Sequence, residues 1–225
     1  MSSAALRLVL FDVDGTLVDS QGDIVGSMAA AFQAVGAGAP ARAAVLGIVG
    51  LSLEVAMQRL LPAADAATHA QMVQAYKDSY VALRAAKGAA SSPLYPGARA
   101  VLAQLAQQPN VLLGVATGKS RRGLEALFDS HDLRGFFVTT QVADHHPSKP
   151  HPSMVLQAMA ETGVGPDDTV VVGDTSFDMD MARAAGARGI AVSWGYHPLQ
   201  ALGAANHVID DFAQLPPLLD QIWSK

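Results

Sequence analysis

The 225-residue sequence contains no cysteine, so disulfides, thiolate metal sites and a cysteine nucleophile are excluded. It contains no run approaching the roughly 18 apolar residues of a membrane span, and its first residues do not resemble a secretory signal. Basic residues are few, with 15 Lys and Arg against 20 Asp and Glu, and the net charge of −5 disfavours nucleic acid or an anionic membrane as the main partner. We therefore expect a soluble, cytoplasmic protein whose partner is a small molecule or another protein.

Half of the residues are hydrophobic, which is enough for a sizeable core in one large domain or two modest ones. In the second part of the chain, helical patterns alternate with short apolar runs. Predicted strands cover residues 8–11, 111–116, 136–138, 169–172 and 189–192, and the predicted helices include 98–107, 154–161 and 177–185. This alternation predicts an α/β fold, a Rossmann-like doubly wound parallel sheet with helices on both faces.

The stretch after the first predicted strand has a different character. Residues 19–92 show helical spacing throughout and no strand pattern. Their last residues and the following proline, 88–93, are small and flexible, as expected where one unit passes the chain to another. We therefore predict an all-helical cap domain over residues 19–92, inserted into a core domain formed by 1–18 and 93–225.

Two carboxylates, Asp12 and Asp14, stand one residue apart at the end of the first predicted strand, and Gly15 follows them. Residues i and i+2 of an extended segment point to the same side, so the two charges would crowd together. At about 4 Å and an effective dielectric near 20, they would repel by roughly 4 kcal/mol. A cation is expected beside them, and Mg²⁺, which prefers oxygen ligands, is the usual candidate.

Further polar residues follow the later strands, where ligands of open parallel sheets bind. Thr117 and Gly118 follow the second core strand, and a hydroxyl with the backbone N–H groups of a turn entering a helix can bind an oxyanion. Lys149 stands in a loop beside two prolines that stiffen the backbone. Asp174 and Asp178 follow the fourth strand and are spaced to lie on one side of the first turn of a helix.

Carboxylates for a cation, together with a hydroxyl and an ammonium group for an anion, suit phosphoryl transfer, in which negative charge spreads over oxygens. Asp12 would attack phosphorus, because a metal ion and a lysine reduce the repulsion between the two anions. Asp14 would protonate the leaving alcohol and then activate water, and its backbone carbonyl could bind the metal.

These motifs resemble the four ordered motifs of the haloacid dehalogenase-like hydrolase superfamily. They are the run 12–16, Thr117, Lys149, and the pair 173–174 with Asp178, and the helical insertion is similar to that superfamily's cap. The phosphoglycolate phosphatase-like subgroup is the most similar. By this resemblance the nucleophile is Asp12, the acid/base is Asp14, the phosphate ligands are Thr117 and Lys149, and the Mg²⁺ ligands are Asp12, the Asp14 carbonyl, Asp174 and Asp178, the last directly or through water.

The resemblance implies a Mg²⁺-dependent phosphatase that acts on a small phosphorylated metabolite, of the phosphoglycolate or sugar-phosphate type, through an aspartyl-phosphate. A phosphomutase of the same superfamily is the alternative, although the cap turn 47–52 lacks the basic residue of the sugar-phosphate mutases, a role that Arg59, Lys77 or Arg84 could take. A signalling module or a non-catalytic phosphate binder is a weaker alternative, because such modules are shorter and place the phosphoacceptor on a later strand.

Three further groups leave their roles open. The basic cluster of Lys119, Arg121 and Arg122 could touch substrate or form a solvated helix start. The histidines His145, His146 and His151 lack the regular spacing of a zinc site, and His151 could instead order the Lys149 loop. Trp194, which follows the last core strand, could line the pocket or close the core.

Overall fold

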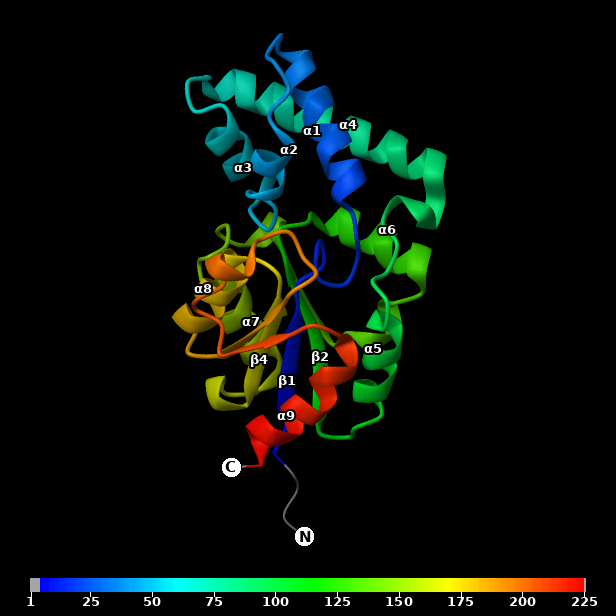
Figure 1. Ribbon diagram of the computed structural model, residues 1–225, viewed down its shortest axis with the longest axis vertical. Coiled ribbons are helices and arrows are strands. Elements are labelled where there is room, and N and C mark those ends of the chain that lie inside the picture. The colour runs from blue at the N-terminus through cyan, green and yellow to red at the C-terminus, as the bar shows by residue number, and fades with distance from the viewer. Residues whose placement is uncertain (1–4, 225) are drawn as a thin grey trace.

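The computed structural model describes residues 5–224, and these form a six-stranded parallel sheet in the order β3-β2-β1-β4-β5-β6 (Figure 1). The strands are β1 (Arg7–Phe11), β2 (Val111–Thr117), β3 (Thr139–Val142), β4 (Thr169–Gly173), β5 (Arg188–Val192) and β6 (His207–Ile209). The first strand lies between β2 and β4, with Leu10 paired to Gly114 on one side and to Val171 on the other. The predicted α/β doubly wound class is confirmed.

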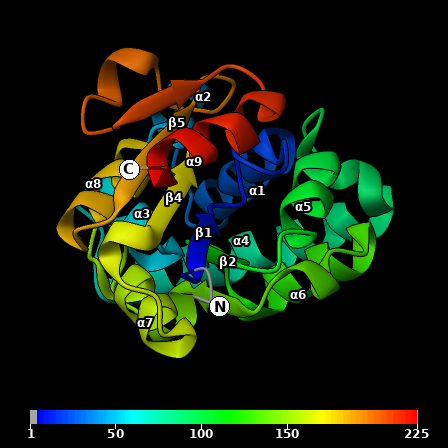
Figure 2. The same cartoon turned by 90° about the horizontal axis from the view of Figure 1, so that it is seen from below.

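Helices cover both faces of the sheet (Figure 2). The helices of the core are α5 (Ala98–Ala106), α6 (Arg121–His131), α7 (Ser153–Thr162), α8 (Ser176–Ala184) and α9 (Leu215–Trp223). Successive residues of β1 point to opposite faces: Val9 and Phe11 pack with apolar residues of α5, α6 and α9, whereas Leu8 and Leu10 pack with those of α7 and α8. All four side chains are fully buried, so this strand is the centre of both layers.

The other four helices lie above the carboxyl ends of the strands (Figure 1). They are α1 (Gln21–Ala34), α2 (Arg42–Leu46), α3 (Leu53–Leu60) and α4 (Ala66–Lys87). Their shared core contains the buried side chains of Met28, Phe32, Met57 and Met72, separate from the sheet's two layers. All four helices fall inside the predicted cap, but its limits at 19 and 92 stay a prediction, and residues 1–4 and 225 of the predicted core lie outside the described part.

The chain leaves and re-enters the core at adjacent points. The amide of Asp19 donates a hydrogen bond to the carbonyl of Pro93 at 2.9 Å, and the amide of Tyr95 donates one to the carbonyl of Leu17 at 3.0 Å. The two connections to the cap are therefore joined by backbone hydrogen bonds. No helix within residues 5–224 is long and apolar enough to cross a membrane.

The predicted strand at 136–138 is wrong. Phe136 ends a short 3₁₀ turn, and Phe137 stacks on Phe128 at a centroid separation of 5.2 Å, so these half-buried aromatic residues pack against the core instead of pairing in the sheet. The strand is β3, which begins at Thr139. Strand β6 and helix α9 were not predicted, because a three-residue edge strand carries little periodicity and the two prolines of α9 resemble a loop, although proline is favoured in the first turn of a helix.

Candidate active site

Asp12 is held by a buried lysine. It directly follows β1 and its side chain is 1% exposed. The Nζ atom of Lys149, from the loop before α7, lies 2.6 Å from Asp12 Oδ1 and 2.6 Å from Asp178 Oδ1. A fully buried ammonium group between two carboxylates remains protonated: burial lowers the pKa of Lys149, but the two aspartates together raise it by more.

Asp174 completes a cluster of three buried carboxylates with Asp12 and Asp178. One oxygen from each lies within 4.8 Å of the others. Asp174 follows β4, and Asp178 lies in the first turn of α8, where its Oδ2 accepts hydrogen bonds from the amide and the hydroxyl of Thr175. Sequence reasoning placed these three carboxylates at neighbouring strand ends, and the structure brings them together.

The cluster fits a divalent cation. With Lys149 included, the three aspartates leave two negative charges in excess, and burial raises the pKa of both Asp12 and Asp174. Oδ2 of Asp12 is buried and has no hydrogen-bond partner among the described residues. An unpartnered buried carboxylate oxygen costs free energy unless a donor or a metal ion binds it, and oxygen donors are the ligands of Mg²⁺.

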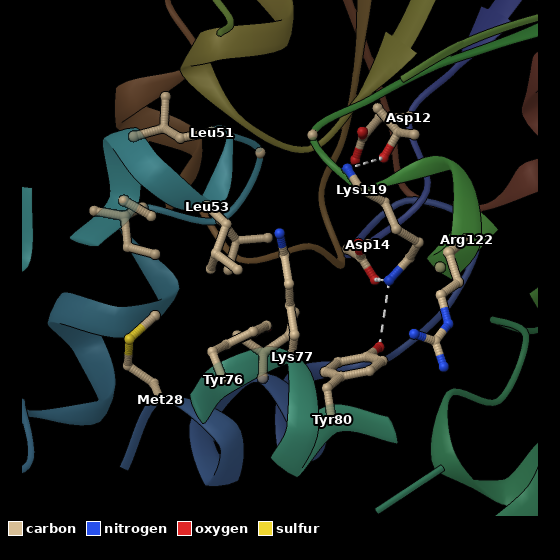
Figure 3. Close-up of a pocket in the computed structure, with 18 of the residues that line it drawn as sticks. Asp12, Asp14, Met28, Leu51, Leu53, Tyr76, Lys77, Tyr80, Lys119 and Arg122 are labelled. Atoms are coloured by element: carbon tan, nitrogen blue, oxygen red, sulfur yellow. Dashed lines mark hydrogen bonds and ion pairs between the residues drawn. The ribbon is translucent and has the colours of Figure 1, made fainter. Parts of the chain in front are cut away.

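Asp14 is bound at a single oxygen by two donors. The hydroxyl of Ser20 donates to Asp14 Oδ1 at 2.5 Å, and Lys119 Nζ lies 3.0 Å from the same atom. Lys119 also donates to the hydroxyl of Tyr80, on the cap helix α4, at 3.3 Å (Figure 3). The sequence left Lys119 open between substrate contact and a solvated helix start. The structure buries it, links it to Asp14 and to the cap, and places it in the lining of the pocket.

Thr117 and Gly118 lie at the end of β2, between the carboxylates and the cap. Thr117 is buried, and its Oγ1 accepts the amide of Lys119 at 3.2 Å. A Cβ atom on Gly118 would lie 2.5 Å from the carbonyl oxygen of Gly50, so no other residue fits there without moving the cap turn. The turn 47–52 therefore reaches the site, and the amide of Ser52 also donates to Ser148 Oγ at 2.8 Å.

Gly15 and Thr16 set the position of Asp174. Gly15 has φ +92°, and a Cβ atom there would lie 2.2 Å from Asp174 Oδ2, so both the backbone and the space require glycine. The hydroxyl of Thr16 donates to Asp174 Oδ1 at 3.0 Å. Trp194 donates to the Thr16 carbonyl at 3.1 Å and packs on Phe212, so it supports this turn and closes the core.

The histidines and Arg121, whose roles the sequence left undecided, do not contact the carboxylate cluster. Both ring nitrogens of His146 are hydrogen-bonded, Nδ1 to Ser153 Oγ at 2.8 Å and Nε2 to Gln141 Oε1 at 2.9 Å. His151 lies in the loop of Lys149, where its Nδ1 accepts the amide of Ser153 at 3.2 Å. Arg121 donates to Thr140 on β3 and points away from the pocket that Arg122 lines.

A pocket of about 170 Å³ opens from Asp12 and Asp14 into the cap (Figure 3). Its core side is formed by Thr117, Gly118 and Lys119, and its cap side by residues of α1, the turn 47–52, α3 and α4. Of the basic residues considered for a second phosphate, Lys77 and Arg84 line this pocket, whereas the guanidinium of Arg59 stacks over Phe177, 5.2 Å from the ring centroid.

Comparison with known proteins identifies the family of this chain. Residues 9–192 match the haloacid dehalogenase-like hydrolase family. The chain is 35% identical to the probable phosphatase IndB of Dickeya dadantii, covering 92% of this chain and 91% of that one. It is 33% identical to a phosphoglycolate phosphatase of Pseudomonas putida, covering 94% of this chain and 79% of that one.

A solved structure described as a predicted phosphoglycolate phosphatase from Haemophilus somnus superposes with a TM-score of 0.82 at 22% identity, covering 95% of this chain and 97% of that one. The β-phosphoglucomutase of Clostridium difficile superposes with a TM-score of 0.83 at 18% identity and 97% coverage of both chains. These two likenesses support the fold. The chain belongs to the haloacid dehalogenase-like hydrolase family. It is a phosphatase of the type to which the phosphoglycolate phosphatases belong.

Proposed function

We propose that the chain hydrolyses small phosphate monoesters in a Mg²⁺-dependent reaction with Asp12 as the nucleophile. The observation that carries the proposal is the environment of Asp12, a buried carboxylate with a lysine on one oxygen and an unpartnered second oxygen. Such a carboxylate is held in place and partly neutralised before an anionic substrate arrives.

In the first step a carboxylate oxygen of Asp12 forms a bond to phosphorus while the bond to the alcohol oxygen breaks, which leaves an aspartyl-phosphate. Asp14 donates a proton to the departing alkoxide. In the second step Asp14 takes a proton from water, and the resulting hydroxide attacks phosphorus to release inorganic phosphate and free Asp12. Lys149 and the turn at Thr117 and Gly118 bind the phosphate oxygens.

When bound, Mg²⁺ would neutralise the charge that the phosphoryl oxygens gain in both steps. Asp12, the Asp14 carbonyl and Asp174 would hold it. Asp178 would bind the ion directly or through a water molecule; its Oδ1 also accepts from Lys149 and its Oδ2 from Thr175.

A phosphomutase is the second candidate. The likeness to a β-phosphoglucomutase fold and the presence of Lys77 and Arg84 in the pocket favour it, since a mutase must bind a second phosphate. A mutase returns an isomer of its substrate, whereas a phosphatase releases inorganic phosphate, so the products separate the two.

The test is a panel of phosphorylated metabolites assayed for phosphate release with and without Mg²⁺, alongside Asp12→Asn. We expect release to need the ion and to fall at least about 10⁴-fold in the variant, the size typical for loss of a nucleophile. Asn keeps the shape of the side chain, so circular dichroism and the melting temperature serve as fold controls. Release that survives either change would contradict the mechanism.

A further inference from the structure

Most of the cap side of the pocket is hydrocarbon, although Lys77 and Arg84 of α4 also line it. Ile24 and Met28 from α1, Ile48 from the cap turn, Leu53 from α3, and the rings of Tyr76 and Tyr80 from α4 line it. Figure 3 shows Leu53, Tyr76 and Tyr80 around the space that extends from Asp14. The alcohol part of a substrate whose phosphate is held at Asp12 would therefore enter a chamber whose walls are largely apolar.

The pocket also has charged lining residues, from both the core and the cap. Among its described lining residues, the carboxylates are Asp12 and Asp14, both from the core. Lys119 is paired with Asp14. Lys77 and Arg122 are exposed to solvent, so their charges stay hydrated, whereas Arg84 is half-buried. The aliphatic side chains of the cap walls offer no hydrogen-bond partner for a highly polar alcohol.

The size of the pocket also favours a bulky alcohol. Its volume is about 170 Å³, and an apolar cavity of about 150 Å³ holds a benzene molecule. A two-carbon hydroxy acid would leave much of this space unfilled. A ring-sized apolar body would displace water from the same walls, which is favourable in proportion to the apolar area buried.

Resting on the proposed function, we propose that the substrates of this phosphatase are monoesters whose alcohol carries a ring-sized apolar body, and that glycolate-sized alcohols are poor leaving groups for it. The cap turn that carries Ile48 is fixed to the core at Gly118 and Ser148, so the apolar wall stands in a defined position above Asp12.

The experiment compares kcat/KM for benzyl phosphate, ethyl phosphate and 2-phosphoglycolate with Mg²⁺ present. Benzyl and ethyl alcohol are both simple primary alcohols, so their ratio reports the contribution of the ring. We expect benzyl phosphate to exceed each of the other two at least tenfold. Equal values, or a preference for 2-phosphoglycolate, would overturn the proposal.

Two pocket variants on different elements, Leu53→Asn and Ile48→Asn, should lower the benzyl-to-ethyl ratio at least fivefold. The matched control is Leu156→Asn, since Leu156 on α7 is 49% exposed and lies outside the pocket; its ratio should equal that of the wild type. A ratio that neither folded pocket variant changes would refute the assignment of these walls. The wild-type ratio decides the proposal even if both variants fail to fold.

The outcomes also separate this inference from the function on which it rests. If 2-phosphoglycolate is hydrolysed well and benzyl phosphate poorly, the phosphatase mechanism stands and the apolar substrate class fails. If neither these three esters nor the metabolite panel releases phosphate, the proposed function itself fails.

Discussion

The core and the cap use buried aspartates differently. In the core, Lys149 is fully buried between Asp12 and Asp178. In the cap, the buried Asp23 is paired with Lys87, whose side chain is 47% exposed. Between the two, Lys119 is 9% exposed and reaches from Asp14 in the core to Tyr80 in the cap.

The surroundings of the Lys149 and Lys87 ion pairs indicate different roles for the two. Lys149 lies among three buried carboxylates and neutralises only one of their charges. The remaining negative charge does not stabilise the fold. The Lys87 pair balances one carboxylate and is completed by a hydrogen bond from Ser91, so it satisfies a buried group of the cap. Replacing Lys149 should therefore mainly reduce catalysis, and replacing Lys87 should mainly reduce the stability of the fold. Replacing Lys119 should have an intermediate effect on catalysis.

Of the three lysine variants, Lys149→Met is expected to have the largest effect. The variant leaves three buried carboxylates without their cation, so phosphate release should fall about 10²- to 10³-fold, the range for loss of a group that stabilises the transition state. Without Mg²⁺ the fold should lose roughly 3–5 kcal/mol, and added Mg²⁺ should restore part of it. Phosphate release and thermal unfolding with and without the ion measure both effects. A variant retaining a tenth of the activity would contradict the role given to Lys149.

An intermediate effect is expected for Lys119→Met. Asp14 keeps its hydrogen bond from Ser20 but loses the charged group that fixes it, so kcat should fall about tenfold, part of the 10²- to 10⁴-fold that acid–base catalysis contributes. Steady-state kinetics measure the change.

The matched control for this variant is Arg121→Met, at the start of α6, the helix that follows Lys119. Arg121 pairs with Glu125 and Thr140 and does not line the pocket, so its kcat should stay within about twofold of the wild type. Equal losses in the two variants would show that Lys119 acts only through the helix.

The smallest effect on activity is expected for Lys87→Met. Asp23 keeps the Ser91 hydroxyl and loses a charged partner, so unfolding should become easier by about 1–3 kcal/mol while phosphate release changes less than twofold. Urea unfolding monitors the first quantity. Arg183→Met removes an exposed pair with Asp180 and should change stability by less than about 1 kcal/mol. A large activity loss in Lys87→Met would mean that the cap pair serves catalysis.

The carboxylate cluster could be predicted because parallel strands bring their ends to one edge. Asp12 and Asp174 directly follow β1 and β4, which are neighbours in the sheet, so the apolar runs alone indicated their meeting. The roles given to these residues remain predictions. Each aspartate can be recognised from the apolar run before it, and the parallel arrangement of the strands brings the aspartates together.

Lys119 and the pocket walls could not be predicted in the same way. Lys119, Arg121 and Arg122 are similar in sequence, and only the start of α6 at Arg121 decides that Lys119 faces Asp14. The walls come from four cap segments that meet only when the helices pack. Strand β3 was misplaced for a related reason: its buried residues include Thr139 and Gln141, hydrogen-bonded to each other, so no apolar run marks it.

The hydrogen bond between Asp19 and Pro93 joins the two ends of the inserted helical segment, so that this segment can be replaced as a unit. The two ends of the inserted segment lie side by side, and the sheet register is set by strands that the insertion does not enter. A longer, shorter or differently folded segment could be joined at the same two residues without shifting Asp12. Descendants of one ancestral chain could in this way exchange their substrates while inheriting the same chemistry.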